Sequence, residues 1–137
     1  MALLSWNEIR IRAIKFSKEW ESETSEHAEA KSFWDGFFDV FGISRRRVAT
    51  FEKSVKKVGG EQGFIDLFWK GVLLVEHKSK GKNLEKAYAQ AKDYFPGLKE
   101  TELPKYILVS DFANFVLYDL DEGGERRFTL NQFPQNI

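Results

Sequence analysis

Three ionisable residues interrupt two apolar segments within residues 63–82, GFIDLFWKGVLLVEHKSKGK. Asp66 lies in the first apolar segment, and Glu76 and Lys78 lie in the second. Charged side chains are costly to bury unless they are paired or bind a metal. Two adjacent carboxylates would suit a hard cation such as Mg²⁺, which completes its shell with water and substrate phosphate. If all three groups converged, the two carboxylates and the lysine would suit metal-assisted hydrolysis of a phosphodiester.

Convergence of these groups depends on the turn between the two predicted strands. Side chains alternate faces along a strand, so Glu76 and Lys78 share one face. A two-residue turn at positions 70–71 places Asp66 opposite Val75, on the other face. One extra loop residue, or a bulge near the turn, instead places Asp66 beside Glu76. In that register Lys78 would orient or deprotonate a metal-bound water, or stabilise charge on the phosphate. The competing interpretation is a surface ion pair between Glu76 and Lys78.

The remaining sequence predicts the helices that must position this hairpin. Ser5 and Glu8 form a capping box, which opens the first helix. Apolar residues at helical spacing predict helices over residues 5–21, 26–41 and 83–95. The buried face of the first helix is expected to hold Trp6, Ile9, Ala13, Phe16 and Trp20.

Short apolar segments predict the strands of one mixed sheet. They cover residues 48–58, 64–69, 72–78, 105–110, 114–120 and 126–130. The order of elements predicts an α/β or α+β fold, a mixed central sheet flanked by helices. We expect a single domain over residues 1–137, made of two N-terminal helices (5–41) and a sheet-and-helix core (48–130).

The composition fits a globular domain with unevenly distributed charge. The 137 residues are 42% hydrophobic and include no cysteine, which excludes disulfides and thiolate metal sites. No apolar segment approaches the length of a membrane span. Net charge is zero, but basic residues flank the hairpin on both sides and are candidates for contacts with DNA phosphates. These candidates are Arg45, Arg46, Arg47, Lys56, Lys57, Lys80, Lys82 and Lys86. The competing interpretation is a set of solvated faces on a structural or interaction domain.

A helical motif follows the hairpin. In AYAQAKDYF, Gln90 and Tyr94 are spaced i, i+4 and so lie on one side of a helix. With Asp66 and the Glu-x-Lys pair on successive strands, this arrangement resembles RecB-like members of the PD-(D/E)XK nuclease superfamily. The resemblance implies that Gln90 and Tyr94 support the metal site or contact DNA. The alternative is that both residues belong to an ordinary helix surface.

Longer segments resemble one group of restriction enzymes. FWDGFFDVFGISRRRVATFE, GFIDLFWKGVLLVEHKSKG, KAYAQAKDYFPGL and LPKYILVSDFANFVLYDL are similar to the N-terminal domain of MmeI-like fused restriction–modification proteins. The resemblance implies a restriction-endonuclease-like fold and a Mg²⁺-dependent type II deoxyribonuclease. It assigns catalysis to Asp66, Glu76 and Lys78, and metal binding to Asp66, Glu76 and a helical glutamate, Glu29, with Glu26 as the alternative.

Two positions depart from the pattern of the superfamily. Ile65 stands where the name PD-(D/E)XK has proline, and His77 stands where we expect glutamine. Because side chains alternate along a strand, His77 should point away from the site and pack or hydrogen-bond behind the sheet. We interpret His77 and His27 as structural residues rather than metal ligands.

The resemblance also implies domains that this sequence does not contain. It includes neither the Gly-rich loop for S-adenosylmethionine nor an NPPY-type loop for a flipped adenine. We therefore expect an N-terminal fragment of a longer prokaryotic, cytoplasmic protein with spacer, N6-adenine methyltransferase and target-recognition domains. S-adenosylmethionine would serve only that methyltransferase. The expected partners are double-stranded DNA and the remaining domains of the same chain, and no interaction with a membrane is expected. The sequence leaves open whether two copies pair transiently to cut both strands. The alternative function is a catalytically silent DNA-binding module with a nuclease-like fold.

Overall fold

A six-stranded sheet forms the centre of the fold. The computed structural model describes residues 4–22, 26–57, 60–79 and 81–136, with only the backbone of residues 26–28. The strands are β1 (Thr50–Lys56), β2 (Gln62–Trp69), β3 (Leu73–His77), β4 (Tyr106–Ser110), β5 (Asn114–Asp119) and β6 (Glu125–Thr129). They follow one another in chain order across the sheet. Strands β3 and β4 are parallel, and every other neighbouring pair is antiparallel.

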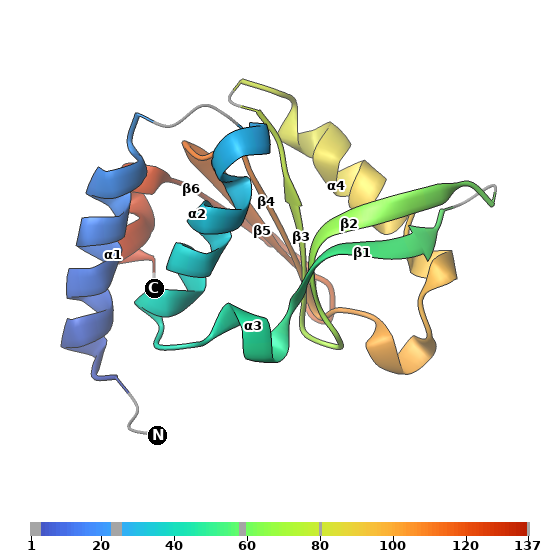
Figure 1. Cartoon of the computed structure of the whole chain (residues 1–137), viewed down its shortest axis with the longest axis horizontal. Helices are drawn as coiled ribbons and strands as arrows, with labels where there is room; N and C mark the ends of the chain where they lie inside the picture. Colours follow the sequence, from blue (N-terminus) through green and yellow to red (C-terminus); the bar gives the residue numbers. More distant parts are fainter. Residues whose placement is uncertain (1–3, 23–25, 58–59, 80, 137) are drawn as a thin grey trace.

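Helices cover both faces of this sheet, as predicted (Figure 1). They are α1 (Trp6–Trp20), α2 (Glu26–Val40), α3 (Arg45–Val48) and α4 (Leu84–Lys92), with 3-10 segments η1 (Phe95–Gly97), η2 (Glu100–Glu102) and η3 (Leu130–Gln135). Helices α1 and α2 and segment η3 pack on one face, while α4 links β3 to β4 across the other. None of the described helices is long and apolar enough to cross a bilayer.

Two hydrophobic clusters hold the layers together. On the α1–α2 face, aromatic rings dominate: Phe33 and Trp34 are almost fully buried and pack edge to face, 5.1 Å apart. On the α4 face, Ala87 and Ala91 let the helix lie close to the sheet, as small side chains do. Aromatic burial of this extent is a large part of the stabilising free energy of a domain this size.

The ends of the helices follow local signals in the sequence. The Ser5 side chain accepts from the Glu8 amide at 3.1 Å and caps α1. The Asn83 side chain caps α4 in the same way, accepting from the next-but-one amide, Glu85, at 2.8 Å. One prediction for α1 is wrong: Trp6, in the first turn, is 68% exposed, whereas Ile9, Ala13, Phe16 and Trp20 are buried.

Several boundaries differ from the predictions. Residues 45–48 form the short helix α3, so the first strand begins at Thr50 rather than at residue 48. Helix α4 ends at Lys92, three residues before the predicted end, and the chain continues into the 3-10 segment η1, which contains the proline and glycine. Strand β2 begins at Gln62, two residues earlier than predicted, because β1 pairs with it along almost its whole length. These differences arise from tertiary pairing and packing that no short window of sequence records.

The β1–β2 hairpin changes face near its middle. Phe51 packs in the α1–α2 cluster, whereas Val55, four residues on, packs in the α4 cluster. Between them, Glu52 has a φ of 53°, which is unusual for a residue with a side chain. Because Phe51 pairs with Leu67, the same register sets Asp66 opposite Glu52. Asp66 therefore lies where the hairpin bends from one face toward the other.

Candidate active site

The loop between β2 and β3 decides where Asp66 points. Three residues, 70–72, join the strands, and Leu67 pairs with Val75. This is the register with one extra loop residue. It is compatible with a φ of 71° at Gly71, a conformation that glycine adopts without strain. Continued by one residue, the register sets Asp66 opposite Glu76, and opposite side chains of an antiparallel pair share a face.

Hydrogen bonds fix both carboxylates in this arrangement. The Asp66 amide donates to Glu76 Oε1 at 3.4 Å, and the His77 amide donates to Asp66 Oδ2 at 2.7 Å. Glu76 is only 1% exposed, and Asp66 is half-buried. Two carboxylates this close, in a setting with little water, form a site of negative charge suited to a cation.

Lys78 joins the same face from the end of β3. Its Nζ donates to Gln90 Oε1 on α4 at 2.7 Å, and this hydrogen bond holds the two side chains together. Both residues are half-buried. The competing interpretation, a surface ion pair between Glu76 and Lys78, does not describe this geometry, since the observed partner of the ammonium is an amide. Gln90 is thereby a supporting residue for Lys78 rather than a free part of the helix surface.

Tyr94, two residues after the end of α4, connects this part of the chain to strand β2. Its hydroxyl donates to the Phe64 carbonyl at 2.8 Å, and the side chain is 2% exposed. Burial and the nearby negative charge of Glu76, and to a smaller extent that of Asp66, raise the pKa of Tyr94 to about 12, although a hydrogen bond with Gln90 opposes the shift. This residue therefore lies beside the two carboxylates and stays protonated at neutral pH.

His77 lies behind the sheet, as its place in the strand predicted. It is 1% exposed, and its Nδ1 accepts from Trp34 Nε1 at 2.9 Å. Burial lowers the pKa of His77 to about 4, with the charge of Asp111 acting in the opposite direction. The imidazole is therefore neutral near pH 7. The side chain of His27 lies outside the described residues.

Asp111 is a buried carboxylate that the sequence analysis did not single out. It is 2% exposed and accepts from the Asn114 amide at 2.8 Å and from the Gly81 amide at 3.1 Å. It thereby ties the loop after β3 to the turn between β4 and β5. The Asp-x-x-Asn spacing in SDFAN was a signal for this turn, because aspartate side chains commonly accept from amides two and three residues on.

The resemblance also implies a helical glutamate at the metal site. Glu29 is half-buried on α2, which packs on the face of the sheet opposite α4, and its role as a metal ligand stays a prediction. The side chain of Glu26 lies outside the described residues.

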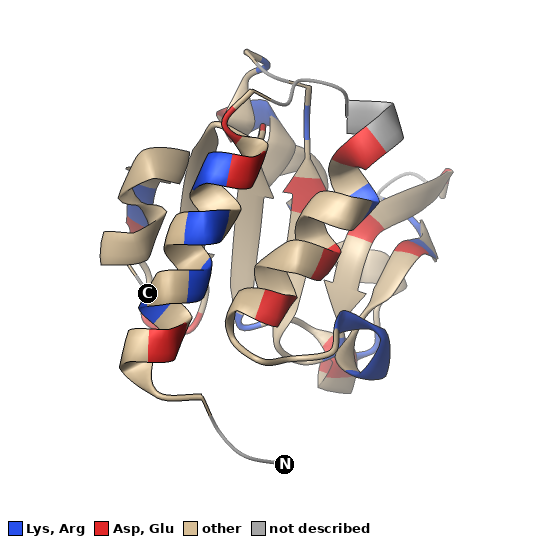
Figure 2. Ribbon diagram, turned by 60° about the vertical axis from the view of Figure 1, so that its left-hand side comes forward, with Lys and Arg blue, Asp and Glu red and all other residues tan. Residues whose placement is uncertain are grey.

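The three consecutive arginines play different structural parts. Arg45 Nε lies 2.6 Å from Asp35 Oδ1, and its guanidinium stacks 4.1 Å from the centre of the Phe51 ring. Only 14% of its side chain is exposed, so Arg45 mainly packs α3 against the rest of the domain. The sequence had instead predicted a side chain that faces solvent and contacts DNA phosphates. Arg46 and Arg47 are exposed, and Figure 2 shows α3 as a basic turn at the surface.

The other basic candidates lie on the opposite half of the molecule or along α4. Lys56, Lys82 and Lys86 are exposed, whereas Lys57 is half-buried over Gly63. Lys80 lies outside the described residues. The exposed lysines are accessible to a partner surface.

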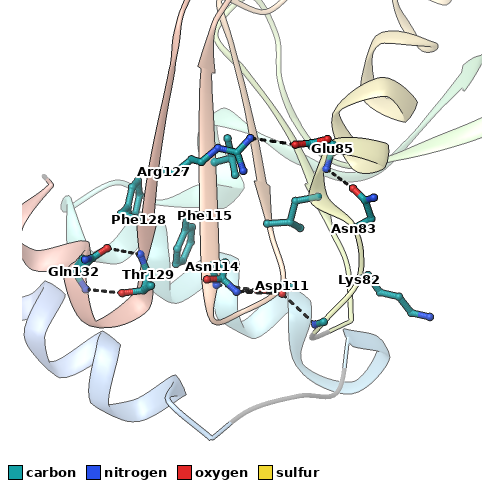
Figure 3. A pocket seen from close by; sticks show the side chains of 13 residues that line it. Lys82, Asn83, Glu85, Asp111, Asn114, Phe115, Arg127, Phe128, Thr129 and Gln132 are labelled. Atoms are coloured by element: carbon teal, nitrogen blue, oxygen red, sulfur yellow. Dashed lines mark hydrogen bonds and ion pairs between the residues drawn. The ribbon is translucent and has the colours of Figure 1, made fainter.

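A polar hollow of about 620 Å³ lies at the start of α4, beside the start of β5 and the end of β6 (Figure 3). Asn83, Asn114 and Thr129 line it, and Arg127 is paired there with Glu85 at 3.6 Å. Asp66, Glu76 and Lys78 do not line this hollow. The candidate catalytic residues therefore lie on β2, at the end of β3 and beside α4, outside this hollow.

Comparison with known proteins agrees with this fold. A family model described as "MmeI, N-terminal domain" matches residues 11–137. A chain from a cryo-EM structure of a DrdV–DNA complex is similar in structure, with a TM-score of 0.57 and 18% sequence identity. The match covers 88% of this chain and 12% of that one, so this chain spans a small part of its structural relative. No curated protein matches the chain.

Proposed function

The chain belongs to the MmeI N-terminal domain family, and from this premise we propose that it is a Mg²⁺-dependent DNA endonuclease module. The observation that carries the proposal is the pairing of Asp66 with Glu76 on one face, with Lys78 next to them and bound to Gln90. The restriction-endonuclease-like fold and a structural relative solved with DNA support the same function.

The donor set fits a magnesium ion. Asp66 and Glu76 offer carboxylate oxygens, the ligands that Mg²⁺ prefers, and waters and substrate phosphate usually complete its shell. When bound, the ion would supply positive charge at the phosphate and lower the pKa of a water. The backbone amides that hold both carboxylates keep the ligands in place beforehand, which lowers the cost of forming the site.

Lys78 is the residue that we propose acts on the reacting groups. Its amino group projects on the face of the two carboxylates. As the ammonium it would orient the attacking water or stabilise charge on the phosphate, and only as the neutral amine would it accept a proton from that water. Gln90 holds it in a single position at 2.7 Å. Tyr94 keeps the hairpin against α4, so that the strand carrying Asp66 and the helix carrying Gln90 move together.

The proposed substrate is double-stranded DNA. Exposed Arg46 and Arg47 on α3, and Lys56, Lys82 and Lys86 elsewhere, would contact phosphates, which position a duplex without reading its sequence. Sequence recognition and an N6-adenine methyltransferase that uses S-adenosylmethionine would belong to other domains of a longer protein. Pairing of two modules to cut both strands is part of this proposal.

Nicking of supercoiled plasmid tests the function directly. The wild-type chain should nick the plasmid with Mg²⁺ and not with EDTA, and Asp66→Asn should abolish nicking while retaining DNA binding. The alternative, a silent DNA-binding module, expects equal DNA binding by both proteins and no nicking by either at any metal concentration. Binding without nicking in the wild type would therefore overturn the endonuclease proposal.

A further inference from the structure

We propose that Trp34 and His77 form a positioning pair that holds the candidate active site from behind the sheet, an inference that rests on the proposed function. His77 lies between Glu76 and Lys78 in β3. Its backbone faces the site, and its side chain faces α2. The residue thus connects the two layers of the domain at the point where the chemistry is proposed.

The connection consists of two hydrogen bonds through one residue. On the site side, the His77 amide donates to Asp66 Oδ2 at 2.7 Å. On the other side, Trp34 Nε1 donates to His77 Nδ1 at 2.9 Å. Movement of the imidazole would therefore turn the peptide that orients the Asp66 carboxylate, and the same strand segment carries Glu76 and Lys78.

Close packing keeps the imidazole from moving. The centre of the His77 ring lies 4.3 Å from that of Phe112 and 5.5 Å from that of Phe33, and both contacts are edge to face. Trp34 and Phe33 are themselves at most 1% exposed. A ring enclosed by such neighbours has one orientation, because protein interiors are packed as densely as organic crystals.

Burial of a histidine here has a cost that packing alone does not explain. With Nδ1 accepting from Trp34, the ring proton is on Nε2, and this buried atom has no hydrogen-bond partner among the described residues. A leucine or phenylalanine would fill the space without burying an unsatisfied donor. The histidine supplies an acceptor for the Trp34 indole, which an apolar side chain does not.

Positioning of this kind has a measurable size. Mutation of a residue that orients a metal ligand through a hydrogen bond usually lowers metal affinity or activity by about 10- to 100-fold. His77→Leu removes the acceptor and keeps an apolar side chain, and Trp34→Phe removes the donor and keeps a ring. His77→Asn keeps an acceptor oxygen near the place of Nδ1, so it should restore most of the lost function.

The matched control is Phe128→Leu. Phe128 belongs to the same aromatic cluster, but it lies on β6, remote from the hairpin. Each variant of the full 137-residue chain is measured for Mg²⁺ affinity by calorimetry, single-turnover plasmid nicking at saturating Mg²⁺, melting temperature, and amide hydrogen exchange at residues 76–78 by NMR. All measurements are made well below the melting temperatures.

We expect His77→Leu and Trp34→Phe each to weaken Mg²⁺ affinity about 10- to 100-fold and to speed amide exchange at residues 76–78. The double variant should be no worse than either single one, because both remove the same hydrogen bond. Phe128→Leu should lower the melting temperature but leave Mg²⁺ affinity and amide exchange at residues 76–78 as in the wild type. If His77→Leu does not fold, Trp34→Phe carries the test.

Equal melting temperatures for His77→Leu and Phe128→Leu, with wild-type Mg²⁺ affinity and exchange in both, would overturn the positioning role. A wild type that neither binds Mg²⁺ nor nicks DNA would reject the proposed function instead. In that case amide exchange, which needs no metal, still decides whether the pair holds this segment.

Discussion

Asp66 on β2 and Glu76 on β3 lie opposite each other, and each carboxylate accepts a hydrogen bond from a backbone amide of the other strand. Glu76 Oε1 accepts from the Asp66 amide at 3.4 Å, and Asp66 Oδ2 accepts from the His77 amide at 2.7 Å. The backbone of the hairpin therefore fixes the separation of two like charges. Such an arrangement is preorganised for a cation rather than assembled by one.

Replacement of Glu76 by glutamine should separate metal binding from folding. The glutamine side chain still offers an oxygen that accepts from the Asp66 backbone amide, but it carries no charge. The melting temperature without metal should therefore hold or rise. In the wild type, Mg²⁺ at about 100 times its Kd should add roughly 2.7 kcal/mol to the free energy of unfolding, and Glu76→Gln should lose this gain. Differential scanning calorimetry with and without Mg²⁺ measures both effects. Exposed Glu122→Gln is the control, and a retained shift in Glu76→Gln would show that the metal binds elsewhere.

Lys78→Ala should abolish plasmid nicking while Mg²⁺ and DNA still bind. Loss of the bond to Gln90 costs about 1 kcal/mol, and relief of a half-buried charge offsets part of it, so the melting temperature should change little. The expected fall in the single-turnover rate is at least ~100-fold, the size typical of a general acid or base. Exposed Lys105→Ala should nick at the wild-type rate. Unchanged nicking by Lys78→Ala would remove this lysine from the chemistry.

Neutralising Arg46 and Arg47 together should weaken DNA binding on every sequence. Each lost phosphate contact lowers the slope of log affinity against log salt by about 0.9, so the double variant should lose roughly 2 from that slope. Fluorescence anisotropy with two unrelated duplexes at several salt concentrations measures it. A double variant of exposed Lys105→Ala and Arg126→Ala, which removes the same two charges elsewhere, is the charge-matched control. A loss limited to one duplex would indicate base reading instead.

Arg45→Ala should act on stability rather than on DNA. Its contacts with Asp35 and the Phe51 ring together contribute about 1–2 kcal/mol to the free energy of unfolding. Urea denaturation should therefore detect the change, and the salt dependence of DNA binding should stay near the wild-type value. A large drop in DNA affinity without loss of stability would return Arg45 to the proposed DNA surface.

Stability without metal should fall as the pH is lowered from 6.5 to about 4, partly because of His77. Burial lowers the pKa of this residue from its ordinary 6.5 to about 4 in the folded protein. In that range the unfolded chain takes up a proton that folded His77 does not, so the contribution of His77 lowers the free energy of unfolding by about 3 kcal/mol and changes no further below pH 4. Urea denaturation at several pH values measures this slope. His77→Asn should flatten it, and an unchanged slope in that variant would assign the dependence to carboxylates.

Much of the fold was predictable from local patterns. The periodicity of α1, α2 and α4 and the caps at Ser5 and Asn83 predicted the helices, and the apolar segments predicted all six strands to within a few residues. Helix α3 was missed, because its four residues carry three arginines and no apolar period. The exposure of Trp6 was missed too, since helical spacing shows which residues share a face but not how much of that face the rest of the fold covers.

By itself, the sequence determined which residues could do chemistry: the Glu-x-Lys alternation places Glu76 and Lys78 on one face of any strand that contains them. It also determined that His77 points to the other face. It left two registers open for Asp66, and only the tertiary structure decided between them, through the three-residue loop and the pairing of Leu67 with Val75. The partners from distant segments, Gln90 for Lys78 and Trp34 for His77, were likewise decided by the packing of α4 and α2 on opposite faces of the sheet. The physical reason is the same in each case: strand geometry is local, whereas register and layer packing depend on contacts between residues far apart in the chain.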